Sequence, residues 1–275
     1  MMKLKVVLDN NTYVDEYYYG EPGVSYYIED EGVRILFDVG YSDIFLENAD
    51  KLGISVSDLD IVALSHGHDD HTKGLGALFK KRASLRDVKK MVLVTHPATF
   101  DKKFLEKEEI GCQMELSEVA KHARLLLMKE PFKLSKNITF LGEIPRLMAF
   151  EKMDSIGIKK VKGKELDDFV EEDSALVFQG SKGIYIITGC SHSGICNIIE
   201  YAKKVTKENR VCAVLGGFHL FKADSEQAQS TIDYLENQNI PVLYPCHCTS
   251  FEVKAAMNQK LNVKEVGVGL TLEWR

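Results

Sequence analysis

Residues 65–71 read Ser-His-Gly-His-Asp-Asp-His and carry the most informative pattern in this chain of 275 residues. The stretch follows an apolar run over residues 61–64, which predicts a short buried strand, and it precedes a helical pattern over 74–81. Three imidazoles and a carboxylate within six positions cannot all point to one side of a strand or a helix. They converge only where the backbone turns sharply, and Gly67 permits such a turn.

The candidate ligands in this stretch are His66, His68, Asp70 and His71. Neutral imidazole and carboxylate are preferred ligands of zinc, and they also suit iron and manganese. The alternative is a polar strand-to-helix loop in which Asp69 or Asp70 caps the helix. That alternative would suffice for a single His-x-His pair, whereas the full set at a strand end favours a metal site.

Three further histidines share this placement at the end of an apolar run. They are His192 in Gly-Cys-Ser-His-Ser-Gly (189–194), His219 in Gly-Gly-Phe-His (216–219) and His247 in Pro-Cys-His-Cys-Thr (245–249). The preceding runs each predict a strand, at residues 183–188, 211–215 and 242–244. Functional groups of open α/β structures gather at strand ends. The repeated placement therefore predicts one shared site.

Strands and helices are expected in both halves of the chain. The other strand patterns cover residues 4–8, 25–29, 34–38, 91–95, 138–141, 175–178, 263–266 and 270–272. The other helical patterns cover residues 43–52, 194–204, 225–237 and 251–259. This pattern predicts an α/β fold with helices outside paired sheets, in a single domain over residues 1–275.

The middle of the chain, residues 97–173, has weaker and more charged patterns. Residues 100–107 and 116–127 are expected to be helical, and 159–164 are expected to form a lysine-rich loop. His71 and His192 are 121 residues apart, so we expect 97–173 to form a cap-like insertion over the cleft.

Composition and charge limit the class of protein and its partners. The chain has 41 acidic and 35 basic residues and a net charge of −6, which argues against a nucleic-acid partner. No apolar stretch is long enough to span a bilayer and no export signal is visible, so we expect a cytoplasmic protein without a membrane partner. The six cysteines are expected to be free thiols.

These motifs together resemble the metallo-β-lactamase superfamily. The resemblance rests on His66-x-His68-x-Asp70-His71, on Gly-Cys-Ser-His at 189–192, on His247, and on the early aspartate of Leu-Phe-Asp-Val-Gly at 36–40. It implies a four-layer αββα sandwich with two divalent metal ions in a cleft at one edge. The motifs are similar to those of a branch that includes the archaeal dihydropterin ribofuranosylaminobenzene phosphate synthase and bacterial metal-dependent hydrolases.

The resemblance also implies a ligand set. His66, His68 and His192 would hold the first metal, and Asp70, His71 and His247 would hold the second. Zinc is the first choice, with manganese and iron as alternatives. The family pattern has a bridging aspartate between the last two histidine motifs, and this chain lacks an evident one. His219 is nearest to that position, and Asp224 is a weaker candidate.

The resemblance implies a metal-dependent hydrolase that uses a metal-activated water on a small phosphorylated or heterocyclic molecule. Asp70 would orient the nucleophile, and His219 would be a ligand or would contact substrate, the second role being slightly favoured. The first alternative is a transferase that releases diphosphate while forming a pterin–ribofuranosylaminobenzene phosphate type of product. The second alternative is a metal-based redox or sensing protein. Whether the chain forms a homo-oligomer is left open.

The sequence also predicts contacts or positions for several other residues. Asp38 is expected to hydrogen-bond a ligating imidazole. The tyrosine-rich segment 13–27 suggests a lid, a subunit interface or a packed loop. His96 is expected to enter the cleft and His122 to lie on the surface. Cys190 has the same parity as His192, so it is expected either to approach the metals or, preferably, to be a packed thiol. Cys246 and Cys248 flank His247 and are expected to face away from it and not to be ligands.

Overall fold

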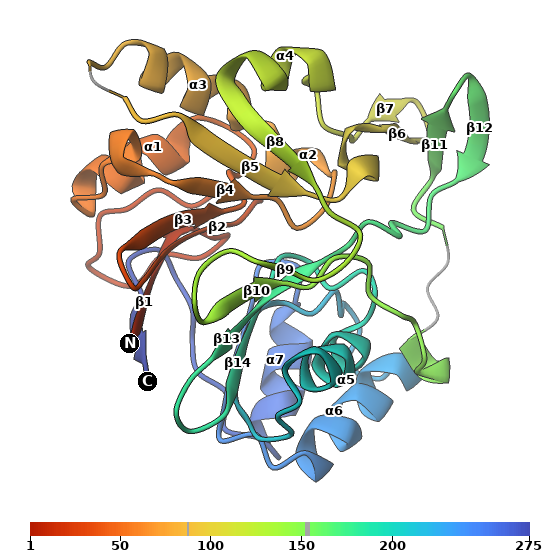
Figure 1. The fold of residues 1–275 in the computed structure, drawn as a ribbon. Helices are drawn as coiled ribbons and strands as arrows, with labels where there is room; N and C mark the ends of the chain where they lie inside the picture. Colours follow the sequence, from red (N-terminus) through yellow and green to blue (C-terminus); the bar gives the residue numbers. More distant parts are fainter. Residues whose placement is uncertain (87, 152–154) are drawn as a thin grey trace.

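The structure is a computed structural model that describes residues 1–86, 88–151 and 155–275. Two large sheets form the centre of the molecule (Figure 1). The first has seven strands in the order β17-β1-β2-β3-β4-β5-β8. Their bounds are β1 Met2–Leu8, β2 Ser25–Asp30, β3 Val33–Phe37, β4 Ile61–Ala63, β5 Met91–Thr95, β8 Ala123–Leu127 and β17 Thr271–Trp274. The second has six strands in the order β16-β15-β14-β13-β10-β9. Their bounds are β9 Phe132–Lys133, β10 Ile138–Phe140, β13 Ala175–Gln179, β14 Ile184–Thr188, β15 Val211–Gly217 and β16 Val242–Cys246.

Helices cover the outer face of each sheet (Figure 1). The helices α1 (Ile44–Lys51) and α3 (Leu75–Ala83) pack on the seven-stranded sheet, where Phe45 and Leu78 share an apolar cluster with Leu36 of β3. The helices α5 (Ile195–Thr206), α6 (Glu226–Asn237) and α7 (Phe251–Asn258) pack on the six-stranded sheet. A third cluster, which includes Ile35 and Leu215, fills the space between the sheets. The predicted α/β sandwich with helices outside paired sheets is confirmed.

Parallel strand pairs place the histidine motifs at one edge of the sandwich. β3, β4 and β5 pair in parallel, as do β14, β15 and β16. The carboxyl ends of parallel neighbours lie at the same edge of their sheet. The short helix α2 (Asp69–Thr72) follows β4 there, while the loops after β14, β15 and β16 carry the other three histidines.

The middle segment is not a continuous insertion. β8, β9 and β10 belong to the two large sheets, whereas β6 (Lys102–Leu105), β7 (Glu108–Glu109), β11 (Ile158–Val161) and β12 (Lys164–Asp167) form a separate four-stranded sheet. The chain within 97–173 therefore leaves the sandwich, returns to it and leaves again. Figure 1 shows the small sheet projecting to one side of the large ones.

Several local predictions in this segment and at the end of the chain were wrong. Residues 100–107 contain strand β6 instead of a helix, because Lys102, Lys103 and Phe104 pair with β11. The predicted helix over 116–127 is helix α4 (Leu116–His122) followed by strand β8, which pairs in parallel with β5. The lysine-rich segment 159–164 lies mostly in the β11–β12 hairpin. Residues 263–266 form only an isolated bridge between Val263 and Leu243.

The remaining helical segments are single 3-10 turns at η1 (Val56–Asp58), η2 (Pro97–Phe100) and η3 (Ala149–Glu151). Within the described ranges, no helix has the length and apolar character needed to cross a bilayer. All six cysteines are free thiols, as predicted.

Candidate metal centre

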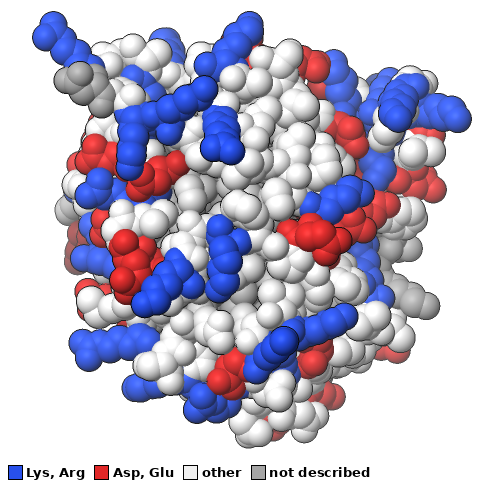
Figure 2. All heavy atoms as spheres, in the orientation of Figure 1, with Lys and Arg blue, Asp and Glu red and all other residues white. Residues whose placement is uncertain are grey.

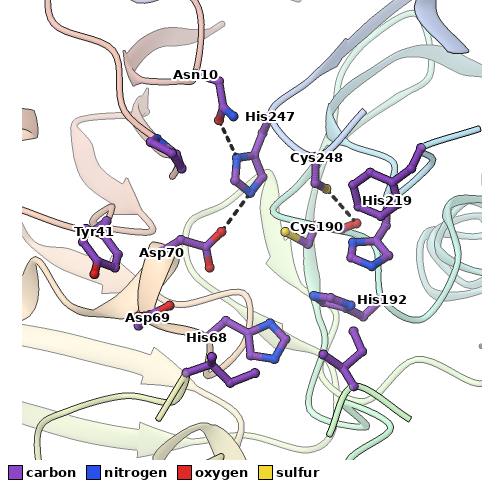
Figure 3. A pocket seen from close by; sticks show the side chains of 14 residues that line it. Asn10, Tyr41, His68, Asp69, Asp70, Cys190, His192, His219, His247 and Cys248 are labelled. Carbon is purple, nitrogen blue, oxygen red and sulfur yellow. Dashed lines mark hydrogen bonds and ion pairs between the residues drawn. The ribbon is translucent and has the colours of Figure 1, made fainter. Parts of the chain in front are cut away.

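The histidine motifs converge in two ligand groups (Figure 3). The first ligand group is His66, His68 and His192, and the second ligand group is Asp70, His71, Cys190 and His247. In each group the ligating atoms lie within 4.8 Å of one another. The structure thus brings together all six residues that the sequence assigns to metals, in the two expected sets, and adds Cys190 to the second.

Three buried imidazoles make up the first ligand group. The ring centroid of His66 lies 4.7 Å from the centroid of His68 and 4.7 Å from that of His192. The centroids of His68 and His192 are 4.8 Å apart. Nδ1 of His66 is 2.9 Å from the Ser65 hydroxyl, which leaves Nε2 to face the group. Nε2 of His68 and both ring nitrogens of His192 are buried and have no hydrogen-bond partner among the residues that the structure describes.

Burial keeps these three rings neutral. Desolvation, reinforced by the neighbouring imidazoles, holds the pKa of His66 and of His192 well below its usual range. Burial also lowers the pKa of His68 to about 4. A neutral imidazole carries the lone pair that a metal ion needs, so the first ligand group is in a ligating state.

The second ligand group contains both charges and imidazoles. Nε2 of His71 lies 3.5 Å from Oδ2 of Asp70 and 3.0 Å from Sγ of Cys190, and Nε2 of His247 lies 3.2 Å from the same Asp70 oxygen. His247 Nδ1 is 2.9 Å from the side-chain oxygen of Asn10. The ring is therefore oriented with Nε2 toward the group.

The expected contact between Asp38 and an imidazole of this set is confirmed. Oδ2 of Asp38 lies 2.8 Å from Nδ1 of His71 and accepts a hydrogen bond of 2.7 Å from the Ser65 hydroxyl. Its Oδ1 accepts from the Ser65 amide at 2.7 Å. A carboxylate at Nδ1 fixes the tautomer that presents Nε2 to the second ligand group.

The electrostatics of the second ligand group favour bound positive charge. Burial opposes ionisation of Asp70, but His71 and His247 outweigh it and hold the pKa of Asp70 well below its usual range. Burial likewise opposes protonation of His71, but Asp70 and Asp38 outweigh it and raise the pKa of His71 to about 9. A divalent cation would supply the same positive charge in place of ring protons.

The residues fit a pair of divalent cations. Buried polar atoms are nearly always hydrogen-bonded in proteins, so the unpartnered nitrogens of His68 and His192 need a partner that the protein does not provide. Each ligand group offers three or four nitrogen, oxygen or sulfur donors, which matches the coordination of zinc and related ions. The donors of both groups therefore suit divalent metal ions.

His219 lies beside the first ligand group. Its ring centroid is 4.3 Å from that of His192 and 4.8 Å from that of Phe221, and its Nδ1 is buried without a hydrogen-bond partner. His219 forms a convergent set with His192 and Cys190. Asp224, the weaker candidate for a bridging carboxylate, belongs to none of the convergent sets of the described residues.

Four residues of this region have positive backbone φ angles although they are not glycine. They are Asp38 (60°), Ser191 (59°), His219 (51°) and His247 (50°). Such angles are uncommon outside glycine and cluster at functional sites. Here they turn the chain sharply just after β3, β14, β15 and β16, and this turn directs the side chains to one place.

A buried ionic cluster supports the loop that carries His66 and His68. The fully buried ammonium of Lys103 lies 3.1 Å from Oδ2 of Asp168 and 2.8 Å from Oε1 of Glu172. The same Glu172 oxygen accepts a hydrogen bond of 3.3 Å from the Gly67 amide. A Cβ on Gly67 would lie 2.4 Å from the Thr99 carbonyl oxygen, so the loop passes too close to its neighbour for any side chain there.

A cavity of about 600 Å³ opens above both ligand groups. Its floor includes His68, Asp70, His192 and His247, and its walls are mostly apolar (Figure 3). The wall residues that sequence reasoning missed are Asn10, Pro22, Tyr41, Ile110, Ile156 and Phe221. They come from five separate loops, with Asn10 and Pro22 in the one between β1 and β2, and no local pattern marks them.

The structure contradicts the expected position of His96 and confirms that of His122. The prediction that His96 enters the cleft was wrong, because its Nε2 pairs with Glu143 at 3.3 Å and the ring does not line the cavity. The surface position of His122 is confirmed, with the ring stacked on Phe79. Sγ of Cys246 is buried beside the Tyr26 hydroxyl, away from both ligand groups, and Cys248 lines the cavity without belonging to either group.

The tyrosine-rich segment 13–27 is divided between the core and the surface. Tyr26 and Tyr27 are buried in β2, whereas Tyr17 is 83% exposed. The Tyr13 hydroxyl donates to the Glu265 carbonyl at 3.1 Å. None of these tyrosines lines the cavity.

Comparison with known proteins gives the family. The family model of the metallo-beta-lactamase superfamily matches residues 18–205. An uncharacterized protein of Methanocaldococcus jannaschii is 34% identical over 94% of this chain and 95% of its own length. The 7,8-dihydropterin-6-methyl-4-(beta-D-ribofuranosyl)-aminobenzene-5'-phosphate synthase of the same organism is 34% identical over 86% of this chain and 84% of its own length.

A solved structure agrees with these sequence relatives. Tm1679, described as a metal-dependent hydrolase of the beta-lactamase superfamily, has a TM-score of 0.84 at 27% identity, and 99% of each chain is covered. Fold, convergent ligand groups and relatives agree, and the chain belongs to the metallo-beta-lactamase superfamily.

Proposed function

We propose that this protein is a metal-dependent hydrolase that acts on a small phosphorylated or heterocyclic molecule. The observation that carries the proposal is the pair of ligand groups, with unpartnered buried imidazole nitrogens, on the floor of a cavity of about 600 Å³. His66, His68 and His192 would hold one divalent ion, and Asp70, His71 and His247 the other. When bound, such ions lower the pKa of water to about 7 and polarise a carbonyl or phosphoryl oxygen.

The side chains around the ligands have distinct tasks in this proposal. The ionised carboxylate of Asp70 lies on the cavity floor and orients the attacking water. Asp38 holds His71 in one tautomer through the contact of 2.8 Å at Nδ1, and Asn10 does the same for His247. His219 lies between His192 and the exposed ring of Phe221, where it contacts the substrate.

The cavity walls favour a substrate with a flat ring. Tyr41 and Phe221 are 41% and 56% exposed, and Ile110 and Ile156 add aliphatic surface. Exposed aromatic side chains beside a cavity are suited to stack on planar ligands.

The charge of the protein disfavours a nucleic acid as substrate. Figure 2 shows basic and acidic side chains interspersed on one face of the molecule. The net charge of −6 disfavours a polyanionic nucleic acid as substrate.

A transferase is the second candidate, and a specific observation favours it. One relative, at 34% identity, is named as a synthase of a pterin–ribofuranosylaminobenzene phosphate. In that case the divalent ions held by the same ligands would bind the diphosphate leaving group. The two candidates are distinguished by incubating the protein with a dihydropterin that carries a diphosphate on its 6-methyl group and with an aromatic amine. Diphosphate release that requires the amine supports the transferase, and release without the amine supports the hydrolase.

The test of the proposed function combines metal analysis with substrate screening. Protein purified without added metal is analysed for elements and assayed on phosphomonoesters and phosphodiesters. His68→Ala should lower metal content and abolish turnover while the circular dichroism spectrum stays the same. His122→Ala, a surface histidine outside the site, should retain both. Unchanged metal content and turnover in His68→Ala would overturn the proposal.

A further inference from the structure

Cys190 differs from the other buried cysteines of this protein in its surroundings. Cys112, Cys196 and Cys246 each belong to a hydrophobic core cluster, as packed thiols do. Cys190 is 3% exposed but belongs to none of these clusters. It is surrounded by imidazoles, by the carboxylate of Asp70 and by Cys248, whose Sγ donates to the Cys190 carbonyl at 3.5 Å.

The sulfur atom lies where the two ligand groups meet. Sγ of Cys190 is 3.0 Å from Nε2 of His71, and it lies within 4.8 Å of the ligating atoms of Asp70 and His247. It also forms a convergent set with His192 and His219. Figure 3 shows the sulfur directed toward the space between Asp70, His247 and His192. Cys190 thus belongs to the second ligand group and lies next to His192 of the first.

A local backbone feature produces this position. Cys190 and His192 follow strand β14, and the intervening Ser191 has a φ of 59°. The Ser191 hydroxyl donates to the Gly217 carbonyl at 2.6 Å, which fixes the turn to the end of β15. The turn presents Cys190 and His192 to the same space, one toward each ligand group.

We propose that Cys190 is a thiolate ligand of the second metal. The inference rests on the proposed metal centre. When the sulfur–metal bond forms, the thiol proton is released to solvent, and no oxidant or reductant is needed. Among the described residues, Asp70 is the one carboxylate in either ligand group, so Cys190 supplies a second anionic donor. A sulfur donor favours zinc, iron or cobalt over magnesium and manganese.

The experiment uses cobalt as a spectroscopic probe. Metal-free full-length protein is titrated with Co²⁺, and the near-ultraviolet region is monitored for the intense charge-transfer band of a cobalt–thiolate bond. The wild type should show this band. Cys190→Ser should lose it and should bind the second equivalent of Co²⁺ at least about tenfold more weakly. Cys248→Ser and Cys212→Ser should retain the band.

X-ray absorption of the zinc-loaded wild type keeps the test independent of whether Cys190→Ser folds. A zinc–sulfur distance of about 2.3 Å is expected. Zinc binding with only nitrogen and oxygen neighbours would overturn the assignment of Cys190, as would a cobalt band that persists in Cys190→Ser or disappears only in Cys248→Ser. If the wild type binds neither metal, the proposed metal centre itself is wrong. The two failures are therefore distinguishable.

Discussion

At the scale of single residues, the environment of each imidazole determines its charge. His66 and His192 are buried among other rings and are neutral, whereas His71 lies between the carboxylates of Asp38 and Asp70. The histidines could be predicted from the sequence because each follows a buried strand. Parity with His192 left the position of Cys190 open, because its contact with His71 joins residues 119 positions apart and depends on the backbone angle at Ser191.

Asp38→Asn tests how the tautomer of His71 is fixed. Asparagine has nearly the same shape and tolerates the positive φ of residue 38, but it lacks the charge that orients the imidazole. We expect metal affinity to fall about 10- to 100-fold, measured by competition with a chromophoric chelator. Asp43→Asn, at an exposed aspartate that makes no side-chain capping bond, is the control and should bind metal like the wild type. Equal affinities in both variants would contradict the prediction.

The raised pKa of His71 makes the stability of the metal-free protein depend on pH. The pKa in the folded state is about 9, above the ordinary value of about 6.5. Protonated His71 therefore stabilises the metal-free protein fully below pH 6.5, and this contribution is lost as the pH rises through 9. Urea unfolding at pH 6, 8 and 9.5 should show the loss. Asp38→Asn should show a smaller loss, and an identical pH profile in the two proteins would count against this cause.

At the scale of elements, the sequence was most informative where a short apolar run ends at a polar motif. The apolar runs of β4, β14 and β16 marked the ends from which the ligands project. Residues 100–107 were predicted to be helical, but strand β6 lies there because it pairs with β11, more than 50 residues further along the chain. No local pattern in β6 encodes that partner. The burial of Lys103 likewise depends on Asp168 and Glu172, which lie in a distant segment.

Two lysines on strand β6 give a matched test of that segment. Lys103→Met would leave the carboxylates of Asp168 and Glu172 buried without their ammonium partner. We expect the free energy of unfolding to fall by about 3–5 kcal/mol. Lys102→Met removes an exposed ion pair with Glu115 and should change it by less than about 1 kcal/mol. Urea unfolding measures both, and equal effects would show that the buried cluster does not stabilise the fold.

At the scale of the whole molecule, the candidate centre joins the two halves of the sandwich. His66, His68, Asp70 and His71 follow strand β4 of the seven-stranded sheet, whereas His192 and His247 follow strands β14 and β16 of the six-stranded sheet. Both ligand groups take donors from both halves. Bound metal would therefore act as a crosslink between segments far apart in the sequence.

Metal removal should lower thermal stability. A ligand that binds only the folded state adds about 2.7 kcal/mol when its free concentration is 100 times its dissociation constant. For a chain of this size we expect Tm to fall by roughly 5–10 °C when zinc is removed by a chelator. Calorimetry with and without chelator measures the shift. The same shift in His68→Ala, which lacks a ligand, would show that the chelator acts elsewhere.

The positive φ angles at Asp38, Ser191, His219 and His247 have a consequence for protein engineering. Each such position costs of the order of 1 kcal/mol or more for a residue other than glycine. A redesign that optimised heat resistance alone would therefore introduce glycine at all four. The product would tolerate higher temperatures, but its cavity would lack two imidazoles, and the carboxylate and the hydroxyl that hold the surrounding loops in place would be gone as well.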